Sequence, residues 1–124
     1  MKLKKKILFI GVAISVIAVF TYVGNASTIN SEQLQNRNGL AYEINSNTPY
    51  KGFAQSFWKN GKKRSEVNLK AGKQDGLVIT WYENGQKSAE GNYKKGQLNG
   101  LVTTWHENGQ VKKKENYKNG KLIS

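Results

Sequence analysis

The sequence predicts an all-β protein, an elongated single-layer antiparallel sheet of tandem β-hairpin repeats. The prediction rests on a 24-residue period, on segments rich in β-branched and aromatic residues, and on Asn-Gly pairs at a fixed place in each period. Aligned without gaps, residues 76–99 and 100–123 are identical at 14 of 24 positions. A fixed period in this range indicates stacked copies of one structural unit.

The framework of each repeat consists of residue types that return every 24 residues. A glycine opens the unit, an aromatic residue ends its first strand, and an Asn-Gly pair follows. These positions are Gly52, Gly76 and Gly100; Phe57, Trp81 and Trp105; Asn60-Gly61, Asn84-Gly85 and Asn108-Gly109. Repeats are therefore expected at 52–75, 76–99 and 100–123. Each is expected to turn at its Asn-Gly pair, where both residues tolerate positive φ. A two-residue loop would pair Trp81 with Ser88, and a loop of three or four residues would change that register, so the register stays open.

Residues 1–26 have the pattern of an export segment. Four lysines within residues 1–6 precede an uncharged, mostly apolar run at residues 7–23, and small residues stand before Ser27. This order is typical of a secretory signal peptide cleaved near Ala26. The alternative is a helix at residues 7–23 that is retained as a membrane anchor. In both cases the lysines stay in the cytoplasm and the rest of the chain is exported.

Two short segments separate the export signal from the repeats. Residues 27–37 are polar and are expected to form a spacer. Residues 38–51 are expected to form a capping strand at 40–44 and a turn at Pro49, which is the only proline. We expect this strand to join the six strands of the repeats in one sheet.

Composition excludes several classes of function. Residues 27–124 carry 16 Lys and Arg against 8 Asp and Glu, a net charge of +8, and the chain has no cysteine. Disulfides, thiol catalysis and cysteine metal sites are thereby excluded. His106 is the only histidine, and one histidine without cysteine does not build a common zinc site. We expect no catalytic residue, no metal and no cofactor.

The candidate contact surface has an aromatic and a basic part. The ring positions Trp58, Tyr82 and His106 differ between repeats, as suits a contact surface. Basic residues follow the Asn-Gly pairs at Lys62, Lys63 and Arg64, at Lys87, and at Lys112, Lys113 and Lys114. Such lysines either protect exposed strands from aggregation or attract an acidic protein, anionic lipid or anionic polymer. The expected export argues against nucleic acid as the partner.

The pattern at residues 76–96 resembles the MORN repeat variant. It reads Gly-Leu-x-x-x-Trp-Tyr-Glu-Asn-Gly-Gln-Lys-Ser-x-Glu-Gly-x-Tyr-Lys-x-Gly, and the resemblance covers residues 37–124. Within this type, the chain is most similar to the YwqK-type antitoxins of toxin–antitoxin systems. The resemblance implies hairpin repeats, no catalysis and a protein- or membrane-binding role. The first repeat departs from the pattern, since Lys59 replaces the glutamate seen at Glu83 and Glu107.

These observations predict a non-enzymatic, exported repeat protein that binds another protein, possible partners being a toxin or an envelope protein. The alternatives are an antitoxin or immunity protein, and a binder of an anionic membrane surface or polymer.

Overall fold

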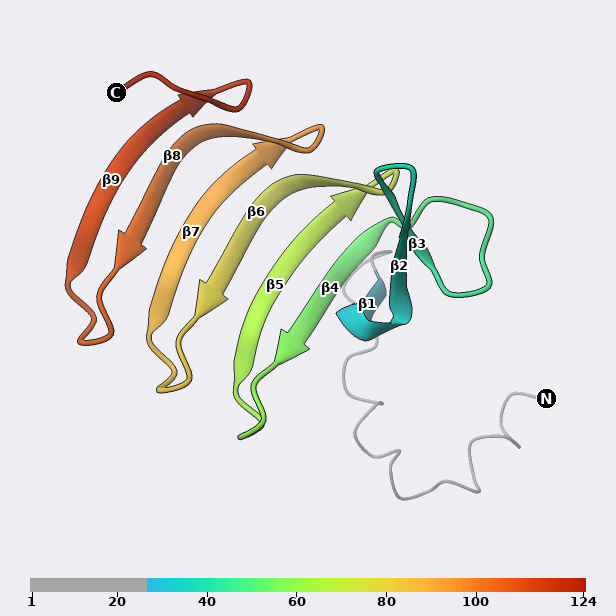
Figure 1. Ribbon diagram of the computed structural model, residues 1–124, viewed down its shortest axis with the longest axis horizontal. Coiled ribbons are helices and arrows are strands. Elements are labelled where there is room, and N and C mark those ends of the chain that lie inside the picture. The colour runs from blue at the N-terminus through green and yellow to red at the C-terminus, as the bar shows by residue number, and fades with distance from the viewer. Residues whose placement is uncertain (1–26) are drawn as a thin grey trace.

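The computed structural model describes residues 27–124, so the predicted signal or anchor segment lies outside the described residues. The described chain confirms the predicted fold class: it is nearly all β and forms a long sheet of consecutive hairpins (Figure 1). The sheet has eight strands in the order β1-β4-β5-β6-β7-β8-β9-β10. Across residues 27–124, we find no helix with the length and apolar character needed to cross a membrane.

Three hairpins make up most of this sheet. They are β4 (Gly52–Phe57) with β5 (Lys63–Lys70), β6 (Lys73–Trp81) with β7 (Lys87–Lys94), and β8 (Gln97–Trp105) with β9 (Val111–Lys118). Successive hairpins are also paired antiparallel, and the short β10 (Lys121–Leu122) folds back on β9. Runs such as Leu77-Val78-Ile79-Thr80 favour strands because branched side chains pack well on a pleated surface.

The tight two-residue turns connect one hairpin to the next. Ala71 and Gly72 have φ of 51° and 79°, and Lys95 and Gly96 have φ of 50° and 86°. Positive φ at both central positions is the type I′ geometry, whose twist matches that of the flanking strands. The paired residues Lys70 and Lys73 close the first of these turns.

The Asn-Gly pairs form a different, longer loop, so of the two loop lengths that the sequence left open the longer one is found. In the second repeat Gly85 has φ of 91°, whereas Asn84 is not among the residues with positive φ. The Asn84 Oδ1 instead accepts a hydrogen bond from Gln86 N at 2.9 Å. The reason is a bulge between Thr80 and Trp81, which pairs Trp81 with Lys87 and lengthens the connection.

The segment predicted as a spacer, residues 27–37, is folded. β1 (Ser27–Asn30) pairs in parallel with β4, the 3₁₀ helix η1 (Ser31–Gln33) follows, and β2 (Leu34–Arg37) begins a hairpin. Polar residues suffice here because the strand is held by backbone hydrogen bonds, while its few apolar side chains face the core. The expected spacer is therefore corrected to a structured part of the fold.

The capping strand also differs from its prediction, because it does not join the main sheet. β3 (Leu40–Glu43) pairs with β2 in a separate two-stranded sheet, and its Tyr42 makes an isolated bridge to Pro49. Asn38 and Gly39 connect them with φ of 52° and 83°, another turn of type I′. The other edge of β3 is occupied by Tyr50 and Gly72, because Ala41 O accepts from Tyr50 N at 2.9 Å and Ala41 N donates to Gly72 O at 2.8 Å.

These N-terminal elements, η1, β2, β3 and the chain as far as Tyr50, form the cap. Its core consists of Tyr50, Ala54 and Leu69, with Ile29, Leu34, Ala41 and Val67 packed against them. The Tyr50 Oη lies 3.2 Å from the carbonyl oxygens of both Ser27 and Phe53, either of which can accept its one proton. Burial raises the pKa of the Tyr50 hydroxyl, and its hydrogen bond with Ser27 opposes that shift.

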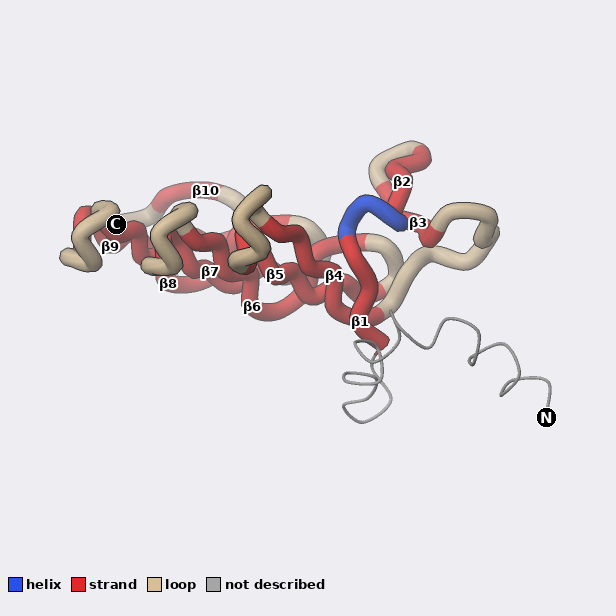
Figure 2. Tube along the Cα trace, turned by 90° about the horizontal axis from the view of Figure 1, so that it is seen from below, coloured by secondary structure: helices blue, strands red, loops and turns tan. Residues whose placement is uncertain are grey.

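The cap covers only one face of the sheet. We call this the capped face and the opposite one the uncapped face. Ala54 and Val67 of the core pair with each other, and Val67 pairs with Val78, so these three side chains share the capped face. Leu77 and Ile79 alternate with Val78 and lie on the uncapped face. The Asn-Gly loops bend toward the side that carries the cap (Figure 2). Beyond β5 the sheet is a single layer.

Gly76 and Gly100 lie inside β6 and β8, not at turns, with φ of 109° and 114°. A Cβ at Gly100 would have no atom within 4 Å, so backbone strain alone disfavours a side chain there. We expect Gly100→Ala and Gly100→Val to lower the free energy of unfolding by similar amounts, about 1–2 kcal/mol. Urea denaturation measures both, with Thr103→Ala as a control in the same strand. A harmless alanine beside a costly valine would contradict the strain argument.

Candidate functional site

The described chain brings no catalytic group together. His106 is exposed, and its backbone N donates to Gln110 O at 2.8 Å within the third Asn-Gly loop. Among residues 27–124 no three histidine or acidic side chains are grouped so as to hold a metal ion.

Two of the three candidate ring residues are used to connect repeats. The Trp58 Nε1 donates to the carbonyl of Trp81 at 3.0 Å, and the Tyr82 Oη donates to the carbonyl of Trp105 at 2.8 Å. Both rings are half-buried. Each reaches from its own repeat to the same backbone position of the next, so the polar ends of Trp58 and Tyr82 are engaged within the chain.

The asparagines of the Asn-Gly pairs make a second connection of the same kind. The Asn60 Nδ2 donates to Glu83 O at 3.1 Å and the Asn84 Nδ2 donates to Glu107 O at 2.9 Å. At the same time each Oδ1 accepts a bond from its own loop, as Asn60 does from Lys62 N at 2.9 Å. Each of these asparagine side chains thus forms one hydrogen bond within its own loop and another to the loop of the following repeat.

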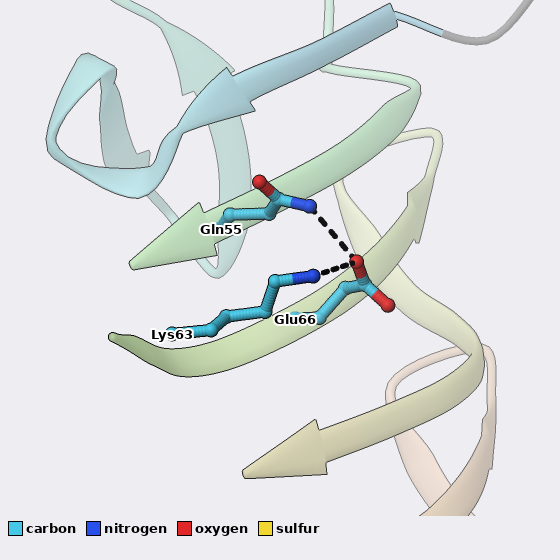
Figure 3. Close-up of polar contacts among 3 residues, drawn as sticks. All are labelled: Gln55, Lys63 and Glu66. Atoms are coloured by element: carbon cyan, nitrogen blue, oxygen red, sulfur yellow. Dashed lines mark hydrogen bonds and ion pairs between the residues drawn. The ribbon is translucent and has the colours of Figure 1, made fainter. Parts of the chain in front are cut away.

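The lysines on the uncapped face are also engaged within the protein. The Lys63 Nζ lies 3.1 Å from Glu66 Oε2, which also accepts a bond from Gln55 Nε2 at 2.9 Å (Figure 3). The Lys63 ammonium also lies 5.4 Å from the centroid of the Trp81 ring in the next repeat. Lys87 repeats the arrangement with Glu90 and with the Trp105 ring at 5.7 Å. Cation–π contacts of this kind add to the cohesion between repeats.

The remaining candidates are distributed over separate places. Lys113 pairs with Glu115 at 3.0 Å, whereas Lys62, Lys112 and Lys114 are exposed. The two basic clusters begin β5 and β9, and three strands separate them in the sheet. They do not converge on one basic site.

A shallow hollow on the capped face brings two of the predicted contact residues, Trp58 and Arg64, together with hydroxyl residues that were not predicted. It measures about 520 Å³, and its lining includes Ser31, Ser56, Trp58, Arg64, Ser65 and Thr80. The Arg64 guanidinium lies 4.9 Å from the centroid of the Trp58 ring. The sequence offered one signal for this hollow, a hydroxyl residue that recurs at Ser56, Thr80 and Thr104.

The uncapped face carries a row of apolar side chains at one position of every repeat. Phe53, Leu77 and Leu101 occupy this position, and Leu77 and Leu101 are 42% and 47% exposed. The strand register sets each beside an asparagine of the neighbouring strand, which gives the row alternating apolar and amide character. We call these three residues the apolar row.

Hairpins joined side by side through repeated contacts define a tandem β-hairpin repeat protein. Residues 74–95 and 98–123 match the family described as MORN repeat variant. These ranges contain nearly all of the second and third hairpins, and they support the resemblance seen in the sequence. Neither the curated proteins nor the solved structures gave a match.

The hydrogen bonds between repeats predict a specific stability effect. Tyr82→Phe removes the bond to the Trp105 carbonyl but keeps the ring, so we expect a loss of about 0.5–1.5 kcal/mol in the free energy of unfolding. His106→Phe changes the equivalent position of the third repeat, where no such bond is seen within residues 27–124, and serves as the control. Equal urea midpoints for wild type and Tyr82→Phe would show that the bond contributes nothing.

Proposed function

We propose that this chain is a non-enzymatic module that binds another protein through the uncapped face. The apolar row is the observation that carries the proposal: Leu77 and Leu101 occupy equivalent places in successive repeats and remain 42% and 47% exposed. Apolar side chains that are gathered on one surface and exposed to water are typical of interaction sites.

The geometry of the sheet supports this use of the face. Equivalent positions of successive repeats lie two strands apart, a separation of about 9.6 Å. The ion pairs of Lys63 and Lys87 flank the row and hold the neighbouring tryptophans in place. A partner would therefore meet a preorganised surface with an apolar centre and charged margins, which is how protein interfaces are built.

The repeat family is consistent with this proposal, because MORN repeats are commonly protein- or membrane-binding modules. An antitoxin or immunity protein would be a narrower form of the same proposal, with a toxin as the bound protein. Identification of the partner decides between the general and the narrow form.

The proposal is tested with a double variant of the apolar row. We expect Leu77→Ser with Leu101→Ser to abolish recovery of a partner that wild-type protein captures from the native cell by crosslinking and affinity purification. Ile44→Ser is the matched control, because Ile44 is 50% exposed but lies after β3, away from the row. It is expected to leave recovery unchanged.

Two results would contradict the proposal. One is the absence of any protein enriched over a mock purification. The other is equal recovery with wild type and the double variant, which would place the interface elsewhere. Urea denaturation of each variant confirms that the proteins compared are folded.

We further propose that the described chain acts outside the cytoplasm, on the strength of the lysines, apolar run and small residues of the first 26 positions. Cell fractionation with intact-mass analysis is expected to find protein that begins at Ser27 in a soluble exported fraction. Protein that begins at Met1 in the membrane fraction would instead indicate a retained anchor. Full-length protein in the cytosol would contradict export.

A further inference from the structure

We propose that a second hollow, at the foot of the cap, binds a soluble organic phosphate through its phosphate monoester group. We call it the turn hollow. It measures about 490 Å³ and lies where the turn of the β2–β3 hairpin meets the turns at residues 71–72 and 95–96 (Figure 1). It belongs to the capped face, away from the apolar row. The proposal rests on the charge of this hollow, on its hydrogen-bond donors and on the contacts that hold them in place.

Two lysines give the turn hollow its charge. Lys73 and Lys95 both line it, and among residues 27–124 neither ammonium group forms an ion pair. The carboxylate of Asp75 accepts a hydrogen bond from Lys95 N at 3.2 Å, but it is not part of the lining, which contains no acidic residue. The lining therefore carries two positive charges. A phosphate monoester matches them with a charge of about −2 at neutral pH, whereas a carboxylate would leave one of them unmatched.

The polar groups of the lining are mainly hydrogen-bond donors. A lysine ammonium group donates three hydrogen bonds and accepts none. The Asn36 Oδ1 already accepts a bond from Gly39 N at 3.1 Å, which leaves the Asn36 Nδ2 to donate to a ligand. Gln74 and Gln97 contribute amide groups that both donate and accept. This surplus of donors complements the terminal oxygens of a phosphate, which only accept.

Contacts between neighbouring turns hold the two lysines on the same hollow. The stem of Lys73 lies against Gly96, since a Cβ placed at Gly96 would be 3.7 Å from Lys73 Cδ. The bond from Lys95 N to Asp75 fixes the backbone of this same turn. Lys73 thus extends from its own turn to the turn that carries Lys95. A ligand that meets partly ordered side chains loses less of its binding free energy to their immobilisation.

The later turns do not reproduce the turn hollow. Gln97 takes the place of Lys73 in the next repeat, and Asn119 takes the place of Lys95 in the turn before β10. The cap contributes Asn36 beside the first turn only. The arrangement therefore suits one compact ligand, and a polymer that extends along the sheet would find no second copy of it.

The size and position of the turn hollow favour a soluble ester. A phosphate group alone would leave much of its volume empty, and Ala41 and Leu69 supply apolar lining for an organic substituent. The cap rises from this face of the sheet (Figure 2), so a flat bilayer laid on the face would meet the cap first. A phosphate on a soluble molecule therefore fits better than a phosphate in a lipid headgroup.

The test titrates the full chain with phenyl phosphate in moderate salt and follows the backbone amides by nuclear magnetic resonance. We expect saturable shifts at Gly39 and Gly96, which line the hollow. Lys73→Gln and Lys95→Gln are each expected to weaken binding about tenfold, as suits the loss of one charge-assisted contact. Lys121→Gln is the matched control, because it removes the same charge from the position equivalent to Lys73 in the last turn, outside the hollow.

Asn36→Asp provides an independent test that leaves the lysines in place. Aspartate keeps an oxygen to accept from Gly39 N but replaces the Nδ2 donor with a negative charge. We therefore expect it to abolish binding of phenyl phosphate while the β2–β3 turn stays intact. Urea denaturation of each variant confirms that the proteins compared are folded.

Three further measurements identify the recognised group. Phenyl sulfate has a similar shape but one negative charge, and it is expected to bind much more weakly. At about pH 5 phenyl phosphate also carries about one charge, because the second pKa of a phosphate monoester is near 6, so its binding is expected to weaken there. Vesicles of phosphatidic acid in phosphatidylcholine present the monoester on a bilayer, and Lys73→Gln is expected not to change their binding relative to Lys121→Gln.

The proposal is overturned if phenyl phosphate shifts no residue of the turn hollow, or if Lys121→Gln weakens binding as much as Lys73→Gln, which would indicate diffuse electrostatic attraction. Equal affinity for phenyl sulfate would also overturn it, because the hollow would then not select a monoester. Vesicle binding that requires Lys73, without binding of phenyl phosphate, would assign the hollow to a membrane surface instead. Since none of these measurements involves the partner of the apolar row, failure here is separable from failure of the proposed protein binding.

Discussion

The fold depends on hydrogen bonds that run from the side chains of one repeat to the backbone of the next. Beyond the cap the sheet is one layer thick, and the three buried apolar residues found among residues 27–124 all belong to the cap core. The later hairpins therefore depend on strand pairing and on the bonds of Trp58, Tyr82, Asn60 and Asn84 to carbonyls of the following repeat. Each such bond contributes roughly 1 kcal/mol to the free energy of unfolding, so the stability of the array depends on the number of these bonds.

Several residues that vary between repeats or carry charge serve these contacts between repeats. Trp58 and Tyr82 differ in type, yet both place a donor on an equivalent carbonyl, so variation between repeats here reflects exchange of one hydrogen-bond donor for another. Lys63 and Lys87 likewise serve cohesion through a glutamate of their own strand and a tryptophan of the next repeat. The residues left for recognition are those whose polar groups the array does not use.

Much of the fold could be predicted from the sequence, because a strict period and strand-forming residues constrain where strands begin and end. The location of the tight turns could not, because an Asn-Gly pair fits both a type I′ turn and a longer loop. The bulge after Thr80 decides between them, and it depends on pairing across strands. The fold of residues 27–37 could not be predicted either. The segment is polar, and its strand β1 forms by parallel pairing with β4, which is distant in the sequence.

The binding surfaces were less accessible to prediction than the fold. The sequence singled out rings and lysines because they are chemically conspicuous, but side-chain direction separates Leu77 from Val78 and so decides which face each residue serves. The hollow near Trp58 brings Ser31 of the cap together with residues of four later strands, β4 to β7, and no local sequence pattern indicates that proximity. The recurring hydroxyl position can be read from the sequence, but the position of Arg64 over the Trp58 ring beside it is seen only in the structure.

The bonds between repeats have a direction, from each donor to the repeat that follows it. A complete unit of 24 residues inserted between the second and third hairpins would receive the donors of Tyr82 and Asn84 and would offer its own to the old third repeat. The insertion lies far from the cap, whose backbone hydrogen bonds to the hairpins end at Gly72, in the turn after β5. Gene duplication can therefore lengthen both faces by whole repeats and adjust the reach of the protein without redesigning its interior.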